Sequence, residues 1–293
     1  MRAKTCSRPV TVAADDAAVE HGHGFGHAYV MTQAEPLIKA TFASPLRQFG
    51  RRALDVLLPP QCLNCSTLVV EQGTLCLDCW QAVTFIGQPQ CAICGLPFEF
   101  AGQGEDFSDG TLCGSCVRQR PVFERARAVL AYDEASSPFI LTFKHADRTE
   151  AASAFARWMA RAGVDVLENA DLIAPVPLHW SRLFRRRYNQ AALLGQSLSA
   201  LSGVRAIPNL LIRKRATPSQ GRFSPSARKR NVSGAFRVRD KYVPEITSKR
   251  IVLIDDVLTT GATVSAVTRA LLKAGAGAVD VLTLGRVLRP FPL

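Results

Sequence analysis

IVLIDDVLTTGAT, at residues 251–263, contains an apolar run, a pair of acids and a small hydroxyl-rich turn in immediate succession. The apolar run predicts a buried strand that ends in Asp255 and Asp256, and the residues after the turn predict a helix. At such a turn the backbone N–H groups, the hydroxyls and the positive end of the helix dipole surround one anion, and Gly261 allows close approach. The stretch therefore predicts a phosphate site formed by Thr259, Thr260, Gly261, Ala262 and Thr263.

The acid pair narrows the choice of ligand. Two adjacent carboxylates are destabilising beside a bare phosphate, unless they accept hydrogen bonds from neutral hydroxyls of the same ligand. A ribose supplies two such hydroxyls, so a ribose phosphate fits both halves of the stretch. The structural alternative is an acidic strand end followed by an N-capped helix, which requires only one Thr or Asp.

On either side of this stretch, apolar runs of strand length alternate with segments of helical periodicity. Strands are predicted at 127–132, 171–177, 249–256 and 278–284, and helices at 137–146, 149–162, 188–201 and 259–275. This alternation predicts an α/β domain with a mostly parallel sheet flanked by helices, which binds ligands beyond the carboxyl ends of its strands.

The chain contains nine cysteines, and eight of them form four C-x-x-C pairs. Two residues between cysteines let one turn present both thiolates to a single ion, and two such turns complete a tetrahedral shell. Two consecutive zinc ribbons are expected, although interleaved pairing of the turns stays open at this point. In the sequential order the ligands are Cys62, Cys65, Cys76 and Cys79 for one site, and Cys91, Cys94, Cys113 and Cys116 for the other.

Redox dithiols and iron–sulfur ligation are the other uses of C-x-x-C pairs. Four copies without a surrounding βαβ pattern argue against the redox use. Zinc held by four thiolates has no open coordination position, so both zinc ions are expected to be structural and to supply folding free energy to ribbons too small to fold alone.

Composition excludes several other classes of protein. The 293 residues are 47% hydrophobic and 20% charged, which excludes a wholly disordered chain or a coiled coil. The chain has neither an apolar run of about 18 residues nor an apolar core near its start, so a cytoplasmic location is expected. A formal net charge of +12 favours polyanionic partners, either nucleic acid or phosphorylated metabolites.

These patterns divide the chain into three parts. Residues 1–43 are expected to be a disordered tail, and 44–120 an amphipathic helix followed by the double zinc ribbon. Residues 121–293 carry the alternating strands and helices.

The stretch at 251–263 resembles the phosphoribosyl pyrophosphate (PRPP) signature of type I phosphoribosyltransferases, with two acids followed by T-T-G-A-T. Together with the cysteine-rich front, APVPLHWSRLFRRRYNQA (174–191) and TPSQGRFSPSARKRNVSGAF (217–236), the chain resembles the ComF family of competence proteins over about residues 50 to 290. The resemblance implies a type I phosphoribosyltransferase-like fold behind the double zinc ribbon.

The resemblance also implies roles for individual residues. Asp255 and Asp256 would hold the ribose hydroxyls, residues 259–263 the 5′-phosphate, and residues 177–187 would take the place of the pyrophosphate loop. A mobile loop at 213–234 would close over the substrates and exclude water. The implied catalytic residues are Asp255, Asp256 and Arg228; the pyrophosphate ligands are Lys144, Arg182, Arg186 and Arg187; the loop residues are Thr217, Gln220, Arg228 and Asn231.

Two functions remain open on the sequence. The first is pentosyl transfer, in which the protein binds Mg²⁺–PRPP, transfers ribose 5-phosphate to an unknown acceptor and releases pyrophosphate. The second is a non-catalytic protein of the transformation machinery, in which the arginine-rich segments and zinc ribbons bind single-stranded DNA. The family's link to DNA uptake adds components of the DNA-uptake helicase machinery as expected partners.

Overall fold

A computed structural model describes residues 59–98, 110–145, 149, 151–215 and 230–288. These residues fall within one compact unit, Phe49–Leu293. The expected tail at 1–43 and the expected helix at 44–58 lie outside the described residues. No helix among the described residues is long and apolar enough to cross a membrane.

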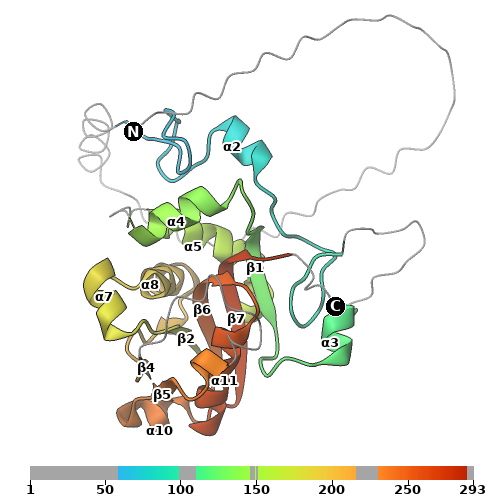
Figure 1. Ribbon diagram of the computed structural model, residues 1–293, viewed down its shortest axis with the longest axis vertical. Coiled ribbons are helices and arrows are strands. Elements are labelled where there is room, and N and C mark those ends of the chain that lie inside the picture. Colours follow the sequence, from blue (N-terminus) through green and yellow to red (C-terminus); the bar gives the residue numbers. More distant parts are fainter. Residues whose placement is uncertain (1–58, 99–109, 146–148, 150, 216–229, 289–293) are drawn as a thin grey trace, which may run out of the picture. The chain divides into compact units, whose positions relative to one another are not determined.

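The main sheet has five parallel strands in the order β1-β7-β6-β2-β3. Their bounds are β1 Ala126–Ala131, β2 Leu172–Pro175, β3 Arg205–Ala206, β6 Arg250–Leu258 and β7 Ala278–Arg286. Figure 1 shows β6 and β7 at the centre of this sheet. The expected mostly parallel sheet is confirmed.

Helices cover both faces of the sheet. One hydrophobic cluster joins α8 (Gln190–Ser202) and α5 (Ala151–Ala162) to Ile173, Val252 and Ile254. A second cluster joins α11 (Ala262–Lys273) to the alternate residues Leu172, Ile251 and Leu253. Because successive side chains of a strand point to opposite faces, the two clusters lie on opposite sides of the sheet.

The remaining elements are short. They are α2 Leu77–Ala82, α3 Gly114–Arg118, α4 Ser137–His145, α6 Val164–Leu167, α7 Trp180–Arg186, a 3₁₀ turn η2 Asp240–Tyr242, α10 Val243–Ile246, and an antiparallel pair, β4 Leu211–Arg213 with β5 Phe236–Val238. All eight strands and helices expected from the sequence are present, and each of their bounds lies within three residues of the expected one. The strand expected at 171–177 forms the shorter β2.

The two cysteine-rich ribbons lie on opposite faces of the sheet, at its β1 edge. Cys62, Leu63 and Leu75 of the first ribbon belong to the cluster with α5 and α8, whereas Cys91 and Ile93 of the second belong to the cluster with α11. The segment between the ribbons pairs with β1, since Ile86 N–H donates to the Val129 carbonyl at 2.8 Å and Ala131 N–H to the Thr84 carbonyl at 2.9 Å. The exposed edge of β1 is thereby covered.

Each ribbon approaches the rest of the molecule through a glycine with positive φ. A Cβ on Gly73 (φ 82°) would lie 2.8 Å from the Ala154 Cβ of α5. A Cβ on Gly95 (φ 67°) would lie 2.4 Å from the backbone oxygen of Ala126, where β1 begins. Only glycine fits these contacts and backbone conformations together.

Candidate functional site

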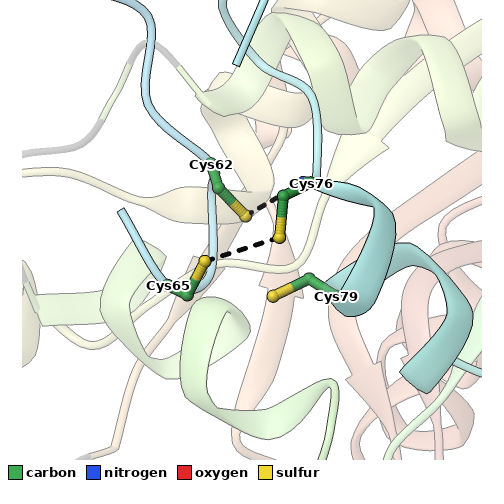
Figure 2. Close-up of side chains that lie close together, drawn as sticks. All are labelled: Cys62, Cys65, Cys76 and Cys79. Atoms are coloured by element: carbon green, nitrogen blue, oxygen red, sulfur yellow. Dashed lines mark hydrogen bonds between the residues drawn. The ribbon is translucent and has the colours of Figure 1, made fainter. Parts of the chain in front are cut away.

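The first cysteine cluster contains Cys62, Cys65, Cys76 and Cys79, and Figure 2 shows their sulfur atoms converging. The four sulfur atoms lie within 4.8 Å of one another, and those of Cys65 and Cys76 are 3.5 Å apart. Zn–S bonds of about 2.3 Å in a tetrahedron place sulfur atoms about 3.8 Å apart, so the cluster fits zinc. Cys76 N–H donates to the Cys62 Sγ at 3.3 Å, a contact that stabilises thiolate charge.

The second cluster contains Cys91, Cys94, Cys113 and Cys116, all buried. Its sulfur atoms also lie within 4.8 Å of one another, and Cys113 N–H donates to the Cys91 Sγ at 3.3 Å. Arg286, at the end of β7, donates through Nη2 to the Cys94 Sγ at 3.4 Å. The sequential pairing of the C-x-x-C turns is confirmed, and two Cys₄ zinc sites fit the double ribbon. Both shells consist of four thiolates and have no position for a substrate.

The acid pair lies at the point where the sheet changes direction. The connection from β2 through α8 leads outward to β3, whereas the connection from β6 through α11 leads the other way to β7. β2 pairs with β6 as far as Pro175 opposite Ile254, and Asp255 is the next residue of β6. In open parallel sheets, ligands bind in the crevice at this switch point, beyond the carboxyl ends of the strands.

The turn after β6 has the backbone expected for anion binding. Gly261 adopts a left-handed conformation with φ 72° and directly precedes α11, and the Ala262 N–H donates to the Thr260 Oγ1 at 3.4 Å. Thr259 is exposed, and residues 260–263 are half-buried. The five predicted phosphate residues are therefore contiguous at the N-terminus of a 12-residue helix, next to Asp255 and Asp256.

The two carboxylates differ in their environments. Burial, and then the charge of Asp256, raise the pKa of Asp255 to about 7, against the Asp256 N–H and the charges of Lys144 and Arg213. The Lys144 Nζ lies 3.0 Å from the Asp256 Oδ2. Lys144, one of the expected pyrophosphate ligands, forms this ion pair with the acid pair.

The expectation of a loop over 177–187 is wrong for most of that stretch, because Trp180–Arg186 forms α7. His179 caps this helix: its Nδ1 accepts a hydrogen bond from Ser181 N–H at 3.4 Å and lies 2.8 Å from the Ser181 Oγ. Only residues 176–179 lie outside regular secondary structure between β2 and the helix.

Three of the predicted pyrophosphate ligands come from α7 and its end. Arg186 has a buried Nε without a hydrogen-bond partner among the described residues, and its Nη1 donates to the Gln190 Oε1 at 3.4 Å. Arg187 ends the helix in a left-handed conformation with φ 65°, which is uncommon outside glycine, and is exposed. Arg182 is half-buried.

Arg213 also belongs to the candidate site, although the sequence places it only at the start of the expected loop. It is buried at the end of β4 and its guanidinium carbon lies 5.2 Å from the centre of the Phe236 ring. Burial, and then the charge of Arg182, lower the pKa of Arg213 to about 10, while Asp255 acts in the opposite direction. The structure thus brings Arg213, Arg182 and Asp255 into electrostatic contact, which no linear motif indicates.

Of the predicted loop residues, Thr217, Gln220 and Arg228 lie outside the described residues. The ends of that segment are held together, since Arg215 donates through Nη2 to the backbone oxygens of Asn231 and Ser233 at 3.4 and 2.9 Å. β4 and β5 pair antiparallel, with Arg213 opposite Phe236, so the described ends of the segment lie beside Arg213.

Tyr188, Asn189 and Gln190 connect α8 to α4 and to the segment that follows β2. Asn189 caps α8 by accepting from Ala191 N–H at 3.1 Å, and it donates to the Val176 backbone oxygen at 3.0 Å. The Tyr188 hydroxyl and the Gln190 Nε2 donate to the backbone oxygens of Phe143 and Lys144, each at 3.0 Å. These bonds fix the end of α4, which carries Lys144, against the connection that follows β2.

Comparisons with known proteins agree with this architecture. A family model for the double zinc ribbon domain matches residues 53–117. The chain is 33% identical over 237 residues to "DNA utilization protein YhgH" of Escherichia coli (strain K12), covering 79% of this chain and 99% of that protein. It is 30% identical over 232 residues to "Competence protein F" of Haemophilus influenzae, covering 77% of this chain and 96% of that one.

The similarity of this chain to solved structures is weaker. The glutamine PRPP amidotransferase from B. subtilis, complexed with ADP and GMP, aligns at 16% identity with a TM-score of 0.30, covering 48% of this chain and 30% of that one. By its identity to competence protein F and to DNA utilization protein YhgH over nearly their whole lengths, the chain belongs to the ComF family.

Proposed function

We propose that the protein binds Mg²⁺–PRPP in the crevice beyond β2 and β6 and transfers its ribose 5-phosphate to an acceptor. The observation that carries this proposal is the acid pair at the switch point of the sheet, followed directly by the Gly261 turn and α11. The helix N-terminus suits the 5′-phosphate of a ribose 5-phosphate, and the two neighbouring carboxylates suit the hydroxyls of its ribose.

Each part of the substrate then has a binding group. The backbone N–H groups of residues 259–263 hold the 5′-phosphate, and Asp255 and Asp256 accept hydrogen bonds from the ribose hydroxyls. The diphosphate, which brings its Mg²⁺ with it, faces the guanidinium groups of α7, whose fork geometry suits phosphate oxygens. Lys144 is close enough to the acid pair to neutralise part of its charge.

Catalysis at such a site requires positioning and charge stabilisation without a covalent nucleophile. The bond between ribose C1 and the diphosphate oxygen breaks, and its electron pair leaves with pyrophosphate. A nucleophile of the acceptor forms the new bond to C1 from the opposite face, with inversion. Exclusion of water from this step is assigned to the segment between β4 and β5, as in the predicted role of that segment.

The test is calorimetric titration of the zinc-loaded protein with PRPP in the presence of Mg²⁺. We expect saturable binding by the wild type and its loss in the Asp255→Asn, Asp256→Asn double variant. Asp240→Asn, which removes an exposed acid elsewhere, is the matched control and should bind as the wild type does. Absence of binding by the wild type at millimolar PRPP would refute the proposal.

A second candidate is a non-catalytic role in binding single-stranded DNA, and the relatives' names, which refer to competence and DNA utilization, fit a role connected with DNA. Basic segments would bind the phosphate backbone, and affinity would fall steeply with salt concentration. Binding of DNA does not require the acid pair. A protein that bound DNA equally well with and without the double Asn substitution, and that did not bind PRPP, would have this function.

A further inference from the structure

A cavity of about 350 Å³ lies between the first zinc ribbon and α5, apart from the crevice described above. Its wall includes Gly73 and Glu71 of the ribbon, Trp80 of α2, and Arg157, Trp158 and Arg161 of α5. The volume is at the lower end of the range for small-ligand sites. The cavity depends on the close approach at Gly73, where an added Cβ would lie 2.8 Å from Ala154 and 3.5 Å from the Arg157 Nη2.

One side of the cavity is aromatic. The centres of the Trp80 and Trp158 rings are 6.4 Å apart with their planes at 77°. Trp80 also packs on Phe85 at 4.5 Å, and Trp158 on Phe155 at 5.5 Å, so each indole is held by a further ring. Trp80 nevertheless remains 48% exposed. A large, supported and accessible aromatic surface suits stacking with a planar ring.

The other side of the cavity is cationic. Arg157 and Arg161 are one helical turn apart on α5, both are exposed, and neither forms an ion pair with any residue that the structure describes. Like charges at this spacing destabilise a helix unless an anion lies between or beside them. Two guanidinium groups one turn apart suit a phosphate group, which each can contact through paired hydrogen bonds.

Glu71 adds a hydrogen-bond acceptor to the wall of the same cavity. A carboxylate accepts from the exocyclic amino group of cytosine or another amino-bearing base, whereas uracil and thymine present at that position a carbonyl oxygen, which a carboxylate repels. We propose that this cavity is a nucleotide-binding site, in which Trp80 and Trp158 contact the base, Arg157 and Arg161 bind the phosphate, and Glu71 favours bases that carry an amino group. The site is independent of the proposed PRPP crevice.

The test uses tryptophan fluorescence of the zinc-loaded full chain. The sequence has three tryptophans, and Trp180→Phe removes the one outside the cavity. In this background we expect CMP to quench the emission saturably, UMP to bind about tenfold more weakly and cytidine, which lacks the phosphate, to bind at least tenfold more weakly. Replacing Glu71 with Gln should remove most of the difference between CMP and UMP.

The Arg157→Gln, Arg161→Gln double variant should lose at least tenfold in CMP affinity. The Arg118→Gln, Arg120→Gln double variant, which removes the same charge near the second ribbon, should retain it. The Asp255→Asn, Asp256→Asn variant should also retain it, which separates this site from the PRPP crevice. Unchanged binding in the Arg157, Arg161 variant, or no saturable quenching by CMP, would overturn the assignment.

A base and its phosphate occur together both in a free nucleotide and in a nucleic acid strand. A short oligo-dC that binds much more tightly than CMP, with an affinity that falls steeply with salt, assigns the site to a strand. An oligomer that binds no better than CMP assigns it to the free nucleotide. If neither quenches the tryptophans, the cavity does not bind nucleotides.

Discussion

Asp255 lies in a setting that opposes its own ionisation. Its carboxyl group is largely removed from water next to a second carboxylate, and these two effects raise its pKa to about 7. A group whose pKa is higher in the folded than in the unfolded state lowers stability progressively as pH rises from its unfolded to its folded pKa. The wild type should therefore lose stability between about pH 4 and pH 7 on account of this residue.

Substitution of Asp255 by Asn should remove this loss. We expect the difference in unfolding free energy, variant minus wild type, to increase by roughly 1–2 kcal/mol between pH 5.5 and pH 7.5 and to be constant above that range. Urea unfolding across this pH range measures the difference in unfolding free energy. Any contribution from titration of the zinc-binding thiolates cancels in the difference, because it occurs in both proteins. Asp171→Asn is the control, because hydrogen bonds from the Arg250 N–H and Lys249 lower the pKa of Asp171. The difference in unfolding free energy between this variant and the wild type should therefore not change with pH over the same range. Parallel curves for Asp255→Asn and wild type would contradict the prediction.

At the scale of elements, the attachment of the second ribbon depends on Gly95. The obstacle to a side chain there is the backbone oxygen of Ala126, which the pairing of β1 with β7 holds in place. At Gly73 the obstacle is a side-chain methyl group of α5 instead. The second contact is therefore the less tolerant of the two.

Gly95→Ala should destabilise the protein by at least roughly 3 kcal/mol, the sum of a left-handed backbone and a steric overlap. Gly203→Ala provides the comparison, because Gly203 has a similar φ of 76° but open space around it and should cost roughly 1 kcal/mol. Thermal unfolding of the zinc-loaded variants measures both. Equal losses of melting temperature would mean that the contact with Ala126 contributes nothing.

The elements also show which features the sequence predicts and which it does not. Strands and helices with strong periodicity and the position of the acid pair follow from local patterns. The spacing of the cysteines predicts two zinc sites, but the structure was needed to choose the sequential pairing over the interleaved one. The residues from Trp180 to Arg186 carry no such pattern, and the His179 side chain caps the helix that they form. Arg213 and the contacts of Tyr188 and Gln190 depend on segments distant in the chain, which the sequence alone does not place.

At the scale of the whole molecule, the zinc sites support both faces of the sheet. Ribbon residues belong to both hydrophobic clusters, and the segment between the ribbons covers the β1 edge. Loss of zinc should unfold ribbons that depend on the metal for their folding free energy. Packing would then be lost on two faces at once, and an unpaired strand edge would be exposed.

Treatment with a strong chelator should therefore lower the melting temperature of the whole protein and cause aggregation, both reversed by stoichiometric zinc. Cys91→Ser should be more damaging than Cys65→Ser, because Cys91 is fully buried within the cluster around α11 whereas Cys65 is exposed. Differential scanning calorimetry with light scattering measures both effects. A chelated protein that stayed monomeric, with an unchanged transition, would show that the sheet is stable without its ribbons.

The position of β7 between β1 and β6 determines the order in which a ribosome could complete this sheet. β1 emerges early, yet its parallel neighbour is the last strand to be made, and at usual rates of translation the interval is on the order of ten seconds. During that interval the segment at 84–86 has already been synthesised and can pair with β1. The segment between the ribbons would thus cover one edge of the nascent strand from the start, so that only the edge that later pairs with β7 stays open.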